Sequence, residues 1–503
     1  MDLTHLNPQQ LQAVTSKTPT TVVLAGPGSG KTRVLTHRVA WMESQGVDPG
    51  RILAVTFTNK AAREMKERLA RLMPTRSARA VTARTFHSFG AWLLRSEMPT
   101  LAPMLAQQLL PVGGRKILGD MGGCKLTGRF MIYDAPDSEA LIKEIVGNLN
   151  LDTQKFTGPI KQQIEAWKAA GLLPSSPELD AAIGHDPALQ NAHTAYLNYQ
   201  ATLLNRNALD FNDLMLYPWL LFELHSPSLD RWRDRFPHIL VDESQDTSTV
   251  QYALLTALAP MGRRVTWLPS GLPSATLFLV GDEDQAIYGW RYADYRNLKA
   301  LMVEHQAETQ VVILVTNYRS GASIVAAATR LIGHNDDRVE KRLVAHNVVS
   351  TVEVVRAASE DDEAYQVAGM VADAIDSGTK PSEIAVLYRA HALSRAIETA
   401  FVRSRIAYRL TKGTDYYSRH EVRDTLAVLR VLGHSDVQSF KRVINAPSRG
   451  LGARAVESIL VAVGTGDGHH GKPGRHLYRR RHRRWSHDYL GAARKTQRPG
   501  GRR

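Results

Sequence analysis

Residues 20–32 read TTVVLAGPGSGKT, and this stretch decides the fold of the chain. The run 20–24 is apolar or β-branched and predicts a buried strand. A glycine-rich loop follows directly, and a helix is expected to begin near Lys31. A strand, a loop of this composition and a helix form the context of a phosphate-binding loop. The alternative, a glycine-rich turn without a ligand, is disfavoured because Gly-Lys-Thr follows a strand.

The loop fits the pattern GxxxxGK[ST] with one departure, since Ala25 stands where the pattern has its first glycine. Glycine has no Cβ, so backbone N–H groups can approach phosphates closely. Lys31 is expected to reach the β- and γ-phosphates of ATP, and Thr32 to ligate Mg²⁺. The predicted ATP-binding residues of the loop are Ala25, Gly26, Gly28, Ser29, Gly30, Lys31, Thr32 and Arg33.

A second apolar run, 239–241, ends in the two carboxylates Asp242 and Glu243. Alone, such an ending means little, and two solvated acids at a strand end are the alternative. Together with a phosphate loop it predicts the other half of a nucleotide site. Asp242 is then expected to bind Mg²⁺, and Glu243 to orient or deprotonate the attacking water.

The composition is that of a globular protein of several domains. At 503 residues, and roughly 150 residues per domain, three or four domains are expected. No run of about 18 apolar residues occurs, so no membrane span is predicted, and the N-terminus lacks the pattern of a secretory signal. Cys124 is the only cysteine, which excludes intrachain disulfides and cysteine metal clusters. A cytoplasmic location is therefore expected.

The formal net charge of +14 is concentrated at the C-terminus. Residues 464–503 hold ten Arg and two Lys against two Asp, which gives +10 and leaves +4 for the other 463 residues. A basic tail of this kind is usually solvated, so it is weak evidence for nucleic-acid binding. Gly, His and Arg dominate this tail, which is expected to be disordered.

Short β-rich runs alternate with helical patterns in two stretches of the chain. Continuous apolar runs suit buried parallel strands, and the helices between them suit crossover connections. The predicted fold class is α/β, with two doubly wound parallel-sheet modules. The predicted strands are 20–24, 52–56, 239–241 and 277–280 in the first module, and 311–315, 352–355 and 384–388 in the second.

A long helical insertion is predicted inside the first module, over residues 96–205. It contains IKQQIEAW at 160–167, with apolar positions at helical spacing. A shorter stretch, 262–274, is rich in Pro, Gly and Ser and is expected to be an irregular surface loop.

With these anchors the chain resembles superfamily 1 DNA helicases of the UvrD/Rep/PcrA type, from about Leu6 to Ile459. Seven motifs in order make the resemblance specific. They are LNPQQLQAV at 6–14 (Q motif), the phosphate loop, TFTNKAA at 56–62 (Ia), TFHSF at 85–89 (Ib), DESQDT at 242–247 (II), GDEDQAIYGWR at 281–291 (III) and NYRS at 317–320 (IV). The segment ALDF at 208–211 resembles the return from the insertion, and 416–424 the start of a second insertion.

The resemblance implies a tandem pair of RecA-like modules, a P-loop NTPase fold, with ATP and Mg²⁺ as cofactors. It puts Gln10 on the adenine edge and Tyr318 against the adenine ring. It implies that Gln285 contacts the γ-phosphate and signals its presence to Trp290. Gln245 is expected to act in a similar way. Arg319 becomes the arginine finger; a structural salt bridge is its alternative.

The resemblance also implies single-stranded DNA and its junctions with duplex as partners, with protein partners left open. Aromatic side chains stack on bases without regard to sequence, at roughly 1–3 kcal/mol per base, as a translocating motor needs. Threonine and asparagine side chains at a strand's carboxyl end can hold phosphates. Core packing is the alternative for any single aromatic. The predicted DNA-binding residues are Thr56, Phe57, Thr58, Asn59, Thr85, His87, Tyr288, Trp290 and Arg291.

The chain departs from the family at several positions. Asn212 stands where Asp is usual, Tyr292 replaces a usual Gly, and the loop 262–274 is extra. Motifs V and VI, which such helicases carry further along, are not found before the basic tail. A truncation or frameshift is therefore expected, in preference to a tail designed to bind DNA.

The expected domains are 1–95 with 206–300 (first module, 1A), 96–205 (insertion, 1B), 301–415 (partial second module, 2A), 416–463 (start of a second insertion, 2B) and 464–503 (tail). The expected function is an ATP-dependent DNA helicase moving 3′→5′ on single strands in repair or replication. A truncated protein that binds ATP and single-stranded DNA with little turnover is the alternative. A small-molecule kinase is disfavoured, because no acceptor site would explain motifs Ia, III and IV.

Overall fold

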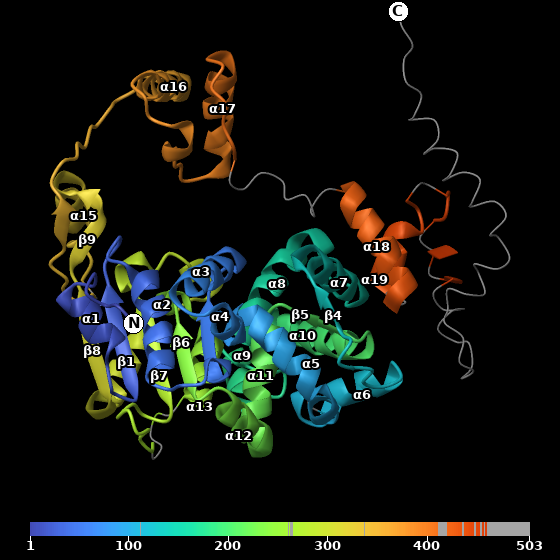
Figure 1. Cartoon of the computed structure of the whole chain (residues 1–503). Coiled ribbons are helices and arrows are strands. Elements are labelled where there is room, and N and C mark those ends of the chain that lie inside the picture. The colour runs from blue at the N-terminus through green and yellow to red at the C-terminus, as the bar shows by residue number, and fades with distance from the viewer. Residues whose placement is uncertain are drawn as a thin grey trace, which may run out of the picture. The chain divides into compact units, whose positions relative to one another are not determined.

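A computed structural model of the chain describes most residues before the basic tail (Figure 1). The described residues are 1–110, 112–259, 261, 265–336, 338–410, 420–434, 437–446, 449–452, 455, 456, 458 and 459. The predicted tail and residues 416–419 of the predicted junction lie outside them. Contacts divide the chain into two units, Met1–Val352 and Glu353–Arg503, and each is described by itself.

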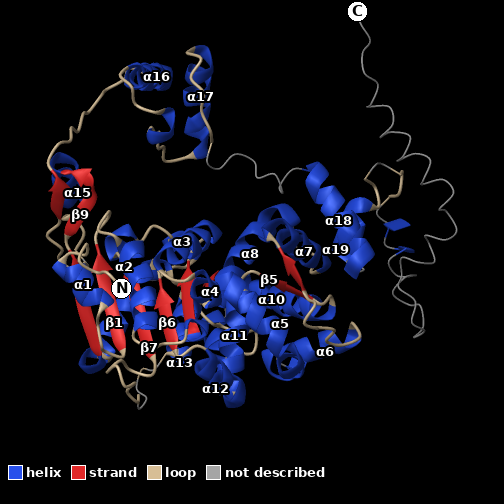
Figure 2. Cartoon of the chain, in the orientation of Figure 1, coloured by secondary structure: helices blue, strands red, loops and turns tan. Residues whose placement is uncertain are grey.

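The first unit is built on one six-stranded parallel sheet of order β3-β2-β6-β7-β1-β8 (Figure 2). Its strands are β1 (Thr20–Ala25), β2 (Ile52–Thr56), β3 (Thr82–Thr85), β6 (His238–Val241), β7 (Thr276–Gly281) and β8 (Thr309–Leu314). The four strands predicted for the first module are confirmed. The α/β class is confirmed as well, since helices connect these parallel strands.

The strand predicted at 311–315 exists, but it does not begin a second sheet. It is β8, and it pairs in parallel with β1, with Thr20 opposite Thr309 and Ala25 opposite Leu314. β1 is buried along its whole length and presents hydrogen-bonding groups on both edges. β7 satisfies one edge and β8 the other, so grouping this strand with the second module was wrong.

Alternate residues of the central strands enter two hydrophobic clusters, one on each face of the sheet. Val23 and Ala25 belong to one cluster, and Val22 and Leu24 to the other. The first face is covered by α1 (Pro8–Val14), α2 (Lys31–Ser44), α3 (Asn59–Leu72) and α4 (Thr75–Ala80). The second is covered by α5 (Phe86–Met104), α11 (Asp213–Leu224), α12 (Ser226–Arg235), α13 (Thr249–Leu258) and α14 (Arg296–Glu304).

The predicted helical insertion forms. Four of its helices have a core of their own: α7 (Ala135–Asn148), α8 (Thr153–Ala169), α9 (Pro177–Ile183) and α10 (Pro187–Asn205). Leu118 of α6 (Val112–Asp120) packs instead in the cluster on the second face of the sheet. The stretch 160–167 lies within α8, as its periodicity predicted. Two short parallel strands, β4 (Met131–Tyr133) and β5 (Ala208–Asp210), join the start and end of the insertion.

A buried ionic cluster ties α8 to the return of the chain after β5. The Lys168 ammonium lies 2.6 Å from the Asp210 carboxylate and 2.8 Å from that of Asp213. The side chains of Lys168 and Asp213 are fully buried. Asn212, the departure noted in the sequence, lies between these two carboxylates in the chain.

The extra loop is not purely a surface feature over its described residues, 265–274. Leu272 is fully buried and packs in the hydrophobic cluster of the α2 face. An isolated antiparallel bridge joins Trp267 and Pro273, and the Trp267 ring is 59% exposed. The loop is therefore anchored at one residue and displays an aromatic ring.

Beyond β8 the chain forms a small element of two parallel strands and a helix: β9 (Thr316–Gly321), α15 (Ala322–Ile332) and β10 (Val344–Asn347). The strands predicted at 352–355 and 384–388 do not form. Val354 is 86% exposed and Leu387 92% exposed. An apolar run becomes a strand only where a neighbour pairs with it, and neither run has such a neighbour among the described residues.

The second unit consists of helices over its described residues. α16 (Glu360–Asp376) and α17 (Ser394–Arg403) pack around Ala364, Ala368 and Phe401. α18 (His420–His434) and α19 (Val437–Val443) contact each other. Among the described helices of the whole chain, none is long and apolar enough to cross a membrane.

Candidate nucleotide and DNA site

The phosphate loop lies between β1 and α2, at the carboxyl edge of the sheet. Gly28 has φ +67° and Gly30 has φ +93°, and both fall in the left-handed region that favours glycine. Gly30 is the N-cap of α2, whose first residue is Lys31. The free N–H groups of this helix end, together with its dipole, favour an anion such as a phosphate.

The segment of β9 packs closely on the phosphate loop. The Asn317 side-chain amide donates to the Pro27 carbonyl at 2.7 Å, and the Tyr318 N–H donates to the Gly28 carbonyl at 2.9 Å. A Cβ placed on Gly28 would lie 2.6 Å from the Arg319 Cβ. Only glycine fits at position 28, therefore, and the exposed Arg319 side chain begins beside the phosphate cradle.

The Q-motif helix α1 is locked to the same loop. The Gln10 amide is buried and donates to the Ser29 carbonyl at 2.9 Å. Asn7 caps α1 and donates from Nδ2 to the Tyr318 hydroxyl at 2.8 Å. The structure thus brings Gln10 and Tyr318 to one loop, and it adds Asn7, which the sequence had not singled out as a site residue.

The acidic strand end faces Lys31. The Lys31 Nζ lies 2.7 Å from the Glu243 carboxylate and donates to the Gln285 Oε1 at 3.3 Å. Thr32 donates a hydrogen bond to the buried Asp242 carboxylate. Five residues that were predicted to surround the phosphates and Mg²⁺ therefore lie together in the structure: Lys31, Thr32, Asp242, Glu243 and Gln285.

The donor set fits Mg²⁺ better than a softer metal. Thr32 and Asp242 offer a hydroxyl and a carboxylate, which are hard oxygen ligands. Over the described residues no group of three or more His, Cys, Asp or Glu could hold a metal by itself. Mg²⁺ usually binds through one or two carboxylates and completes its shell with phosphates and water, so this set suits Mg·ATP.

Burial makes two carboxyl groups here easy to protonate. Burial first, and then the Glu243 charge, raise the pKa of Asp242 to about 6, although Lys31 opposes this. The same two causes raise the pKa of Asp246 to about 7. A cation bound nearby would oppose both shifts.

Glu243 holds its carboxylate in place through an unusual backbone conformation. Its φ is +52° and its ψ +48°, the left-handed region that a residue with a Cβ seldom adopts. Such a residue costs of order 1–3 kcal/mol and persists only where its surroundings impose it. Here a buried strand ends at Val241, and a 3-10 turn begins at Ser244.

Two glutamines connect the acids of motif II with motif III. The Gln245 amide donates to the Glu243 carboxylate at 3.0 Å and accepts from the Asp282 N–H at 2.9 Å. The Gln285 amide donates to the Asp282 carboxylate. The two predicted sensor residues are thus both linked to Asp282, at the carboxyl end of β7.

Aromatic rings from two motifs meet beside this network. The ring centroids of Phe57 and Tyr288 are 4.8 Å apart, and those of Tyr288 and Trp290 are 6.2 Å apart. The Arg291 guanidinium lies over both the Phe57 and Trp290 rings. Trp290 is 73% exposed, which contradicts core packing for this ring. Stacked rings and a cation at a sheet edge suit single-stranded nucleic acid.

The predicted phosphate-binding threonines occupy the same edge. Thr56 and Thr85 are paired neighbours at the ends of β2 and β3. Thr58 caps α3 by accepting from the Ala61 N–H, and Thr85 caps α5 by accepting from the Ser88 N–H. Two helix N-termini, at Asn59 and Phe86, therefore open toward this edge.

His87 lies one residue into α5, and its ring centroid is 5.8 Å from that of Phe211. Burial, assisted by the Arg291 charge, lowers the pKa of His87 to about 4. The side chain is therefore neutral at physiological pH.

Tyr292, the departure beside Trp290 and Arg291, has φ +64°. Glycine adopts this conformation freely, which explains the physical role of the residue that is usual there. The Tyr292 hydroxyl donates to the Gln162 carbonyl in α8 at 3.0 Å. The substitution thus adds a contact between motif III and the insertion.

A charged segment that belongs to none of the sequence motifs crosses motif III. We call residues 338–343, which read RVEKRL, the strap. Lys341 and Arg338 form ion pairs with motif III carboxylates, and a Cβ on Gly26 would meet the Leu343 side chain. Lys341 and Asp282 are 59 residues apart in the chain, so no local pattern announced this contact.

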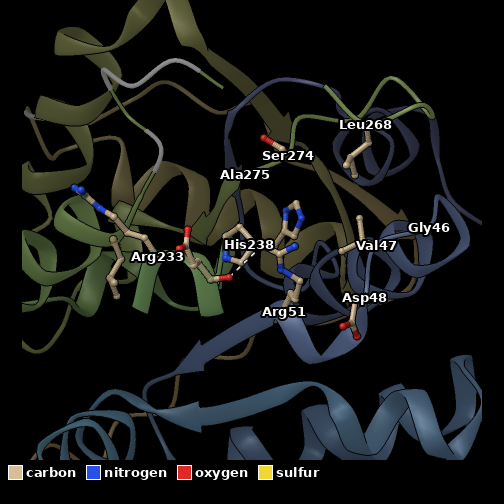
Figure 3. A pocket seen from close by; sticks show the side chains of 12 residues that line it. Gly46, Val47, Asp48, Arg51, Arg233, His238, Leu268, Ser274 and Ala275 are labelled. Carbon is tan, nitrogen blue, oxygen red and sulfur yellow. Dashed lines mark hydrogen bonds between the residues drawn. The ribbon is translucent and has the colours of Figure 1, made fainter. Parts of the chain in front are cut away.

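A cavity of about 320 Å³ lies at the other edge of the sheet (Figure 3). It is lined by Arg51 and His238, which stand at the amino ends of β2 and β6, and by Leu268 and Ser274 of the extra loop. Parallel sheets bind ligands at their carboxyl edge. This cavity is therefore separate from the candidate site.

Comparisons with known proteins agree with this geometry. Residues 6–306 match the family model described as the UvrD/REP helicase N-terminal domain, and residues 312–465 match the UvrD-like helicase C-terminal domain. A Staphylococcus epidermidis protein named ATP-dependent DNA helicase PcrA is 35% identical over 458 residues, which is 90% of this chain and 58% of the relative. Its namesake from Staphylococcus aureus strain COL is 34% identical over 465 residues, which is 91% of this chain and 58% of the relative. The chain thus spans less than two thirds of the length of these relatives.

Proposed function

The chain belongs to the UvrD/REP helicase family, and from that premise we propose that it hydrolyses Mg·ATP to move along single-stranded DNA. The relatives' name, ATP-dependent DNA helicase, supports strand separation at single-strand to duplex junctions as the result of this movement. A 3′→5′ direction and a part in repair or replication belong to the proposal.

One observation carries the proposal more than any other. Gln285 contacts Lys31, which faces the acids of motif II, and Trp290 stands five residues further along the same short segment. A movement of Gln285 on loss of the γ-phosphate can therefore reach the exposed Trp290 ring through five residues of the backbone. Such a path is what coupling between hydrolysis and DNA contact requires.

We assign the residues the following parts. Lys31 and Arg319 stabilise charge on the phosphates, Asp242 and Thr32 hold Mg²⁺, and Glu243 orients the attacking water. Mg²⁺ supplies charge neutralisation between the β- and γ-phosphates when it is bound. Gln10 and Tyr318 hold the adenine, while the DNA stacks on Phe57, Tyr288 and Trp290 and bonds to the residues at the ends of β2 and β3.

The domain proposal follows the same lines. We infer that residues 1–95 and 206–300, together with β8, form module 1A with 96–205 as insertion 1B. The rest of 301–415 then corresponds to 2A, and 416–463 to the start of 2B. The family match at 312–465 supports the second pair.

The test is the steady-state ATPase rate of the purified chain with and without single-stranded DNA. Stimulated turnover is expected, and it should be lost in Lys31→Ala and Glu243→Gln because each removes a group at the phosphates. Lys161→Ala is the matched control, since Lys161 pairs with the exposed Glu139 in the insertion. Tailed duplexes with a 3′ or 5′ single strand then report the direction of unwinding.

A second candidate is a protein that binds ATP and single-stranded DNA with little turnover. ATP binding that depends on Lys31, without a DNA-stimulated rate, would establish this candidate and contradict the first.

The DNA surface is tested separately by Trp290→Ala. Loss of one stacking ring should weaken binding of a single-stranded oligonucleotide by about 1–3 kcal/mol. Trp267→Ala is the control, because Trp267 is also exposed but lies in the extra loop beside the opposite edge of the sheet. Equal losses in the two variants would contradict the proposed surface. Deletion of 464–503 is expected to leave most of the affinity in place.

A further inference from the structure

The strap places a buried cation among the three acids of motif III. The Lys341 Nζ lies 2.9 Å from Asp282 Oδ1, 2.7 Å from Glu283 Oε1 and 3.2 Å from Asp284 Oδ2. The Lys341 side chain is only 1% exposed. Arg338 binds the outer face of Asp284 at 2.8 Å. Three carboxylates are therefore held by two cations of the strap.

Asp282 links Lys341 to the candidate nucleotide site. One of its carboxylate oxygens accepts from Lys341, and the other accepts from the Gln285 side-chain amide. The Gln285 amide oxygen in turn accepts from the Lys31 Nζ at 3.3 Å. The Asp282 side chain is fully buried, so water does not compete for these bonds.

We propose that Lys341 is a positioning residue for ATP hydrolysis: it fixes the Asp282 carboxylate, which holds the amide of Gln285 opposite Lys31. The inference rests on the proposed ATPase and adds a residue outside the motifs to its machinery. The strap also touches Gly26 through Leu343. It therefore contacts both the phosphate loop and motif III.

Stability alone does not account for this lysine. A buried ion pair gains little over apolar residues of the same volume, because desolvation offsets the attraction between the charges. Removing only one partner is different, since it leaves a buried charge without compensation. Without Lys341, the Oδ1 atom of Asp282 loses its cation. The carboxylate is then free to turn toward another donor, and such a turn releases the Gln285 amide from Oδ2.

The first test compares Lys341→Met with Arg342→Met in DNA-stimulated ATP hydrolysis. Arg342 is the neighbouring cation, but its side chain is 92% exposed and its ion-pair partner is the exposed Glu340. Lys341→Met is expected to lower kcat by about 10- to 100-fold, the range that misplacement of a reacting group produces. The KM for ATP should change little, because the loop and the adenine contacts remain. Arg342→Met should match the unaltered chain.

A double-mutant cycle with Gln285→Ala identifies the route of the effect. If Lys341 acts through Gln285, Lys341→Met should lower kcat no further once Gln285 is alanine. Multiplying effects in the double variant would overturn the proposal, as would a normal kcat in Lys341→Met.

The double variant Lys341→Met/Glu283→Gln separates a loss of positioning from a folding defect. It removes one buried negative charge together with the positive one, and a glutamine at 283 can still accept from the Val339 N–H that now bonds Glu283. This variant should fold, yet it should keep the low kcat because Asp282 still lacks the ion pair with Lys341. Recovery of kcat in this folded variant would show a purely structural role and overturn the inference.

Amide hydrogen exchange separates failure of the inference from failure of the proposed function. In the ligand-free chain, the amides of residues 282–285 are expected to exchange faster in Lys341→Met than in Arg342→Met. Faster exchange without any ATPase in the unaltered chain would leave the proposed function wrong and the positioning contact right. Equal exchange in the two variants would overturn the inference whatever the ATPase result.

Discussion

At the scale of single residues, Glu243 combines a reactive position with a strained backbone. Glu243→Ala and Glu243→Gly both remove the carboxylate that faces Lys31, so neither variant should turn over ATP. Only glycine relieves the left-handed φ of +52°. The glycine variant should therefore be more stable than the alanine variant by about 1 kcal/mol, measured by urea unfolding. Equal stabilities would mean that the backbone at this position is not strained.

His238 is a second residue whose environment sets a measurable property. It is buried at the start of β6, where Nδ1 lies 3.0 Å from the Thr276 hydroxyl. Burial, with added repulsion from Arg38 and Arg51, lowers the pKa of His238 from its ordinary value of 6.5 to about 3. The unfolded chain therefore binds this proton at a higher pH than the folded chain does.

Between pH 6.5 and 3 the free energy of unfolding should consequently fall as the pH drops, by up to about 1.4 kcal/mol per pH unit from this group. His238→Asn keeps a partner for Thr276 and should flatten that acid slope in urea unfolding from pH 7 to pH 4. His185→Asn is the control, because His185 is exposed on the insertion. The same slope in both variants would contradict the assignment.

At the scale of elements, the insertion is tied to the first module by the buried cluster of Lys168, Asp210 and Asp213. Lys168→Met leaves two buried carboxylates without a cation and should lower the free energy of unfolding by about 3–5 kcal/mol. Lys161 lies on the same helix, and Lys161→Met breaks a pair whose carboxylate, Glu139, is exposed, so it should cost less than about 1 kcal/mol. Chemical denaturation compares the two, and similar losses would show that the cluster is not a critical contact.

Some strands could be predicted from the sequence and others could not. β1, β2, β6 and β7 are continuous apolar runs buried on both faces, so their composition alone indicated them. β3 is TART, too short and polar to stand out. The runs at 352–355 and 384–388 look similar to β1 in composition. They form no strand, because composition predicts burial and cannot supply the neighbouring strand.

The candidate site divides in the same way. Lys31, Asp242 and Gln285 could be predicted because each sits in a short motif that fixes its place at the end of a strand. Lys341 could not, because its contact with Asp282 joins segments 59 residues apart. Tyr292 departs from the glycine that the family usually has, and its φ of +64° is the physical reason for that glycine, which no local pattern indicates. Local patterns predict local geometry, and long-range ion pairs need the fold.

At the scale of the whole molecule, the first unit holds every residue of the proposed site from Gln10 to Lys341. Residues 351–357 form neither helix nor strand and are exposed, including Arg356. Trypsin should therefore cleave at Arg356 before it cuts the sheet, because exposed segments without backbone pairing are the preferred sites of proteolysis. The fragment 1–356 should remain folded and bind a fluorescent ATP analogue with an affinity comparable to that of the full chain.

Mass spectrometry of the digest identifies the cut, and fluorescence titration in Mg²⁺ measures binding. Loss of binding on cleavage would show that residues after 356 contribute to the nucleotide site. Retained binding without DNA-stimulated hydrolysis would assign turnover to the second unit.

The packing of Leu343 against Gly26 has a kinetic consequence. A ligand that must displace a packed side chain before it reaches the phosphate loop associates in two steps, a rapid encounter and a slower opening. In stopped-flow mixing with a fluorescent ATP analogue, the observed rate should rise with concentration and then level off at the opening rate. Leu343→Ala removes the covering side chain, so the plateau should move to higher rates while the slope at low concentration steepens. A strictly linear dependence for the unaltered chain would mean that Leu343 moves aside as fast as ATP arrives.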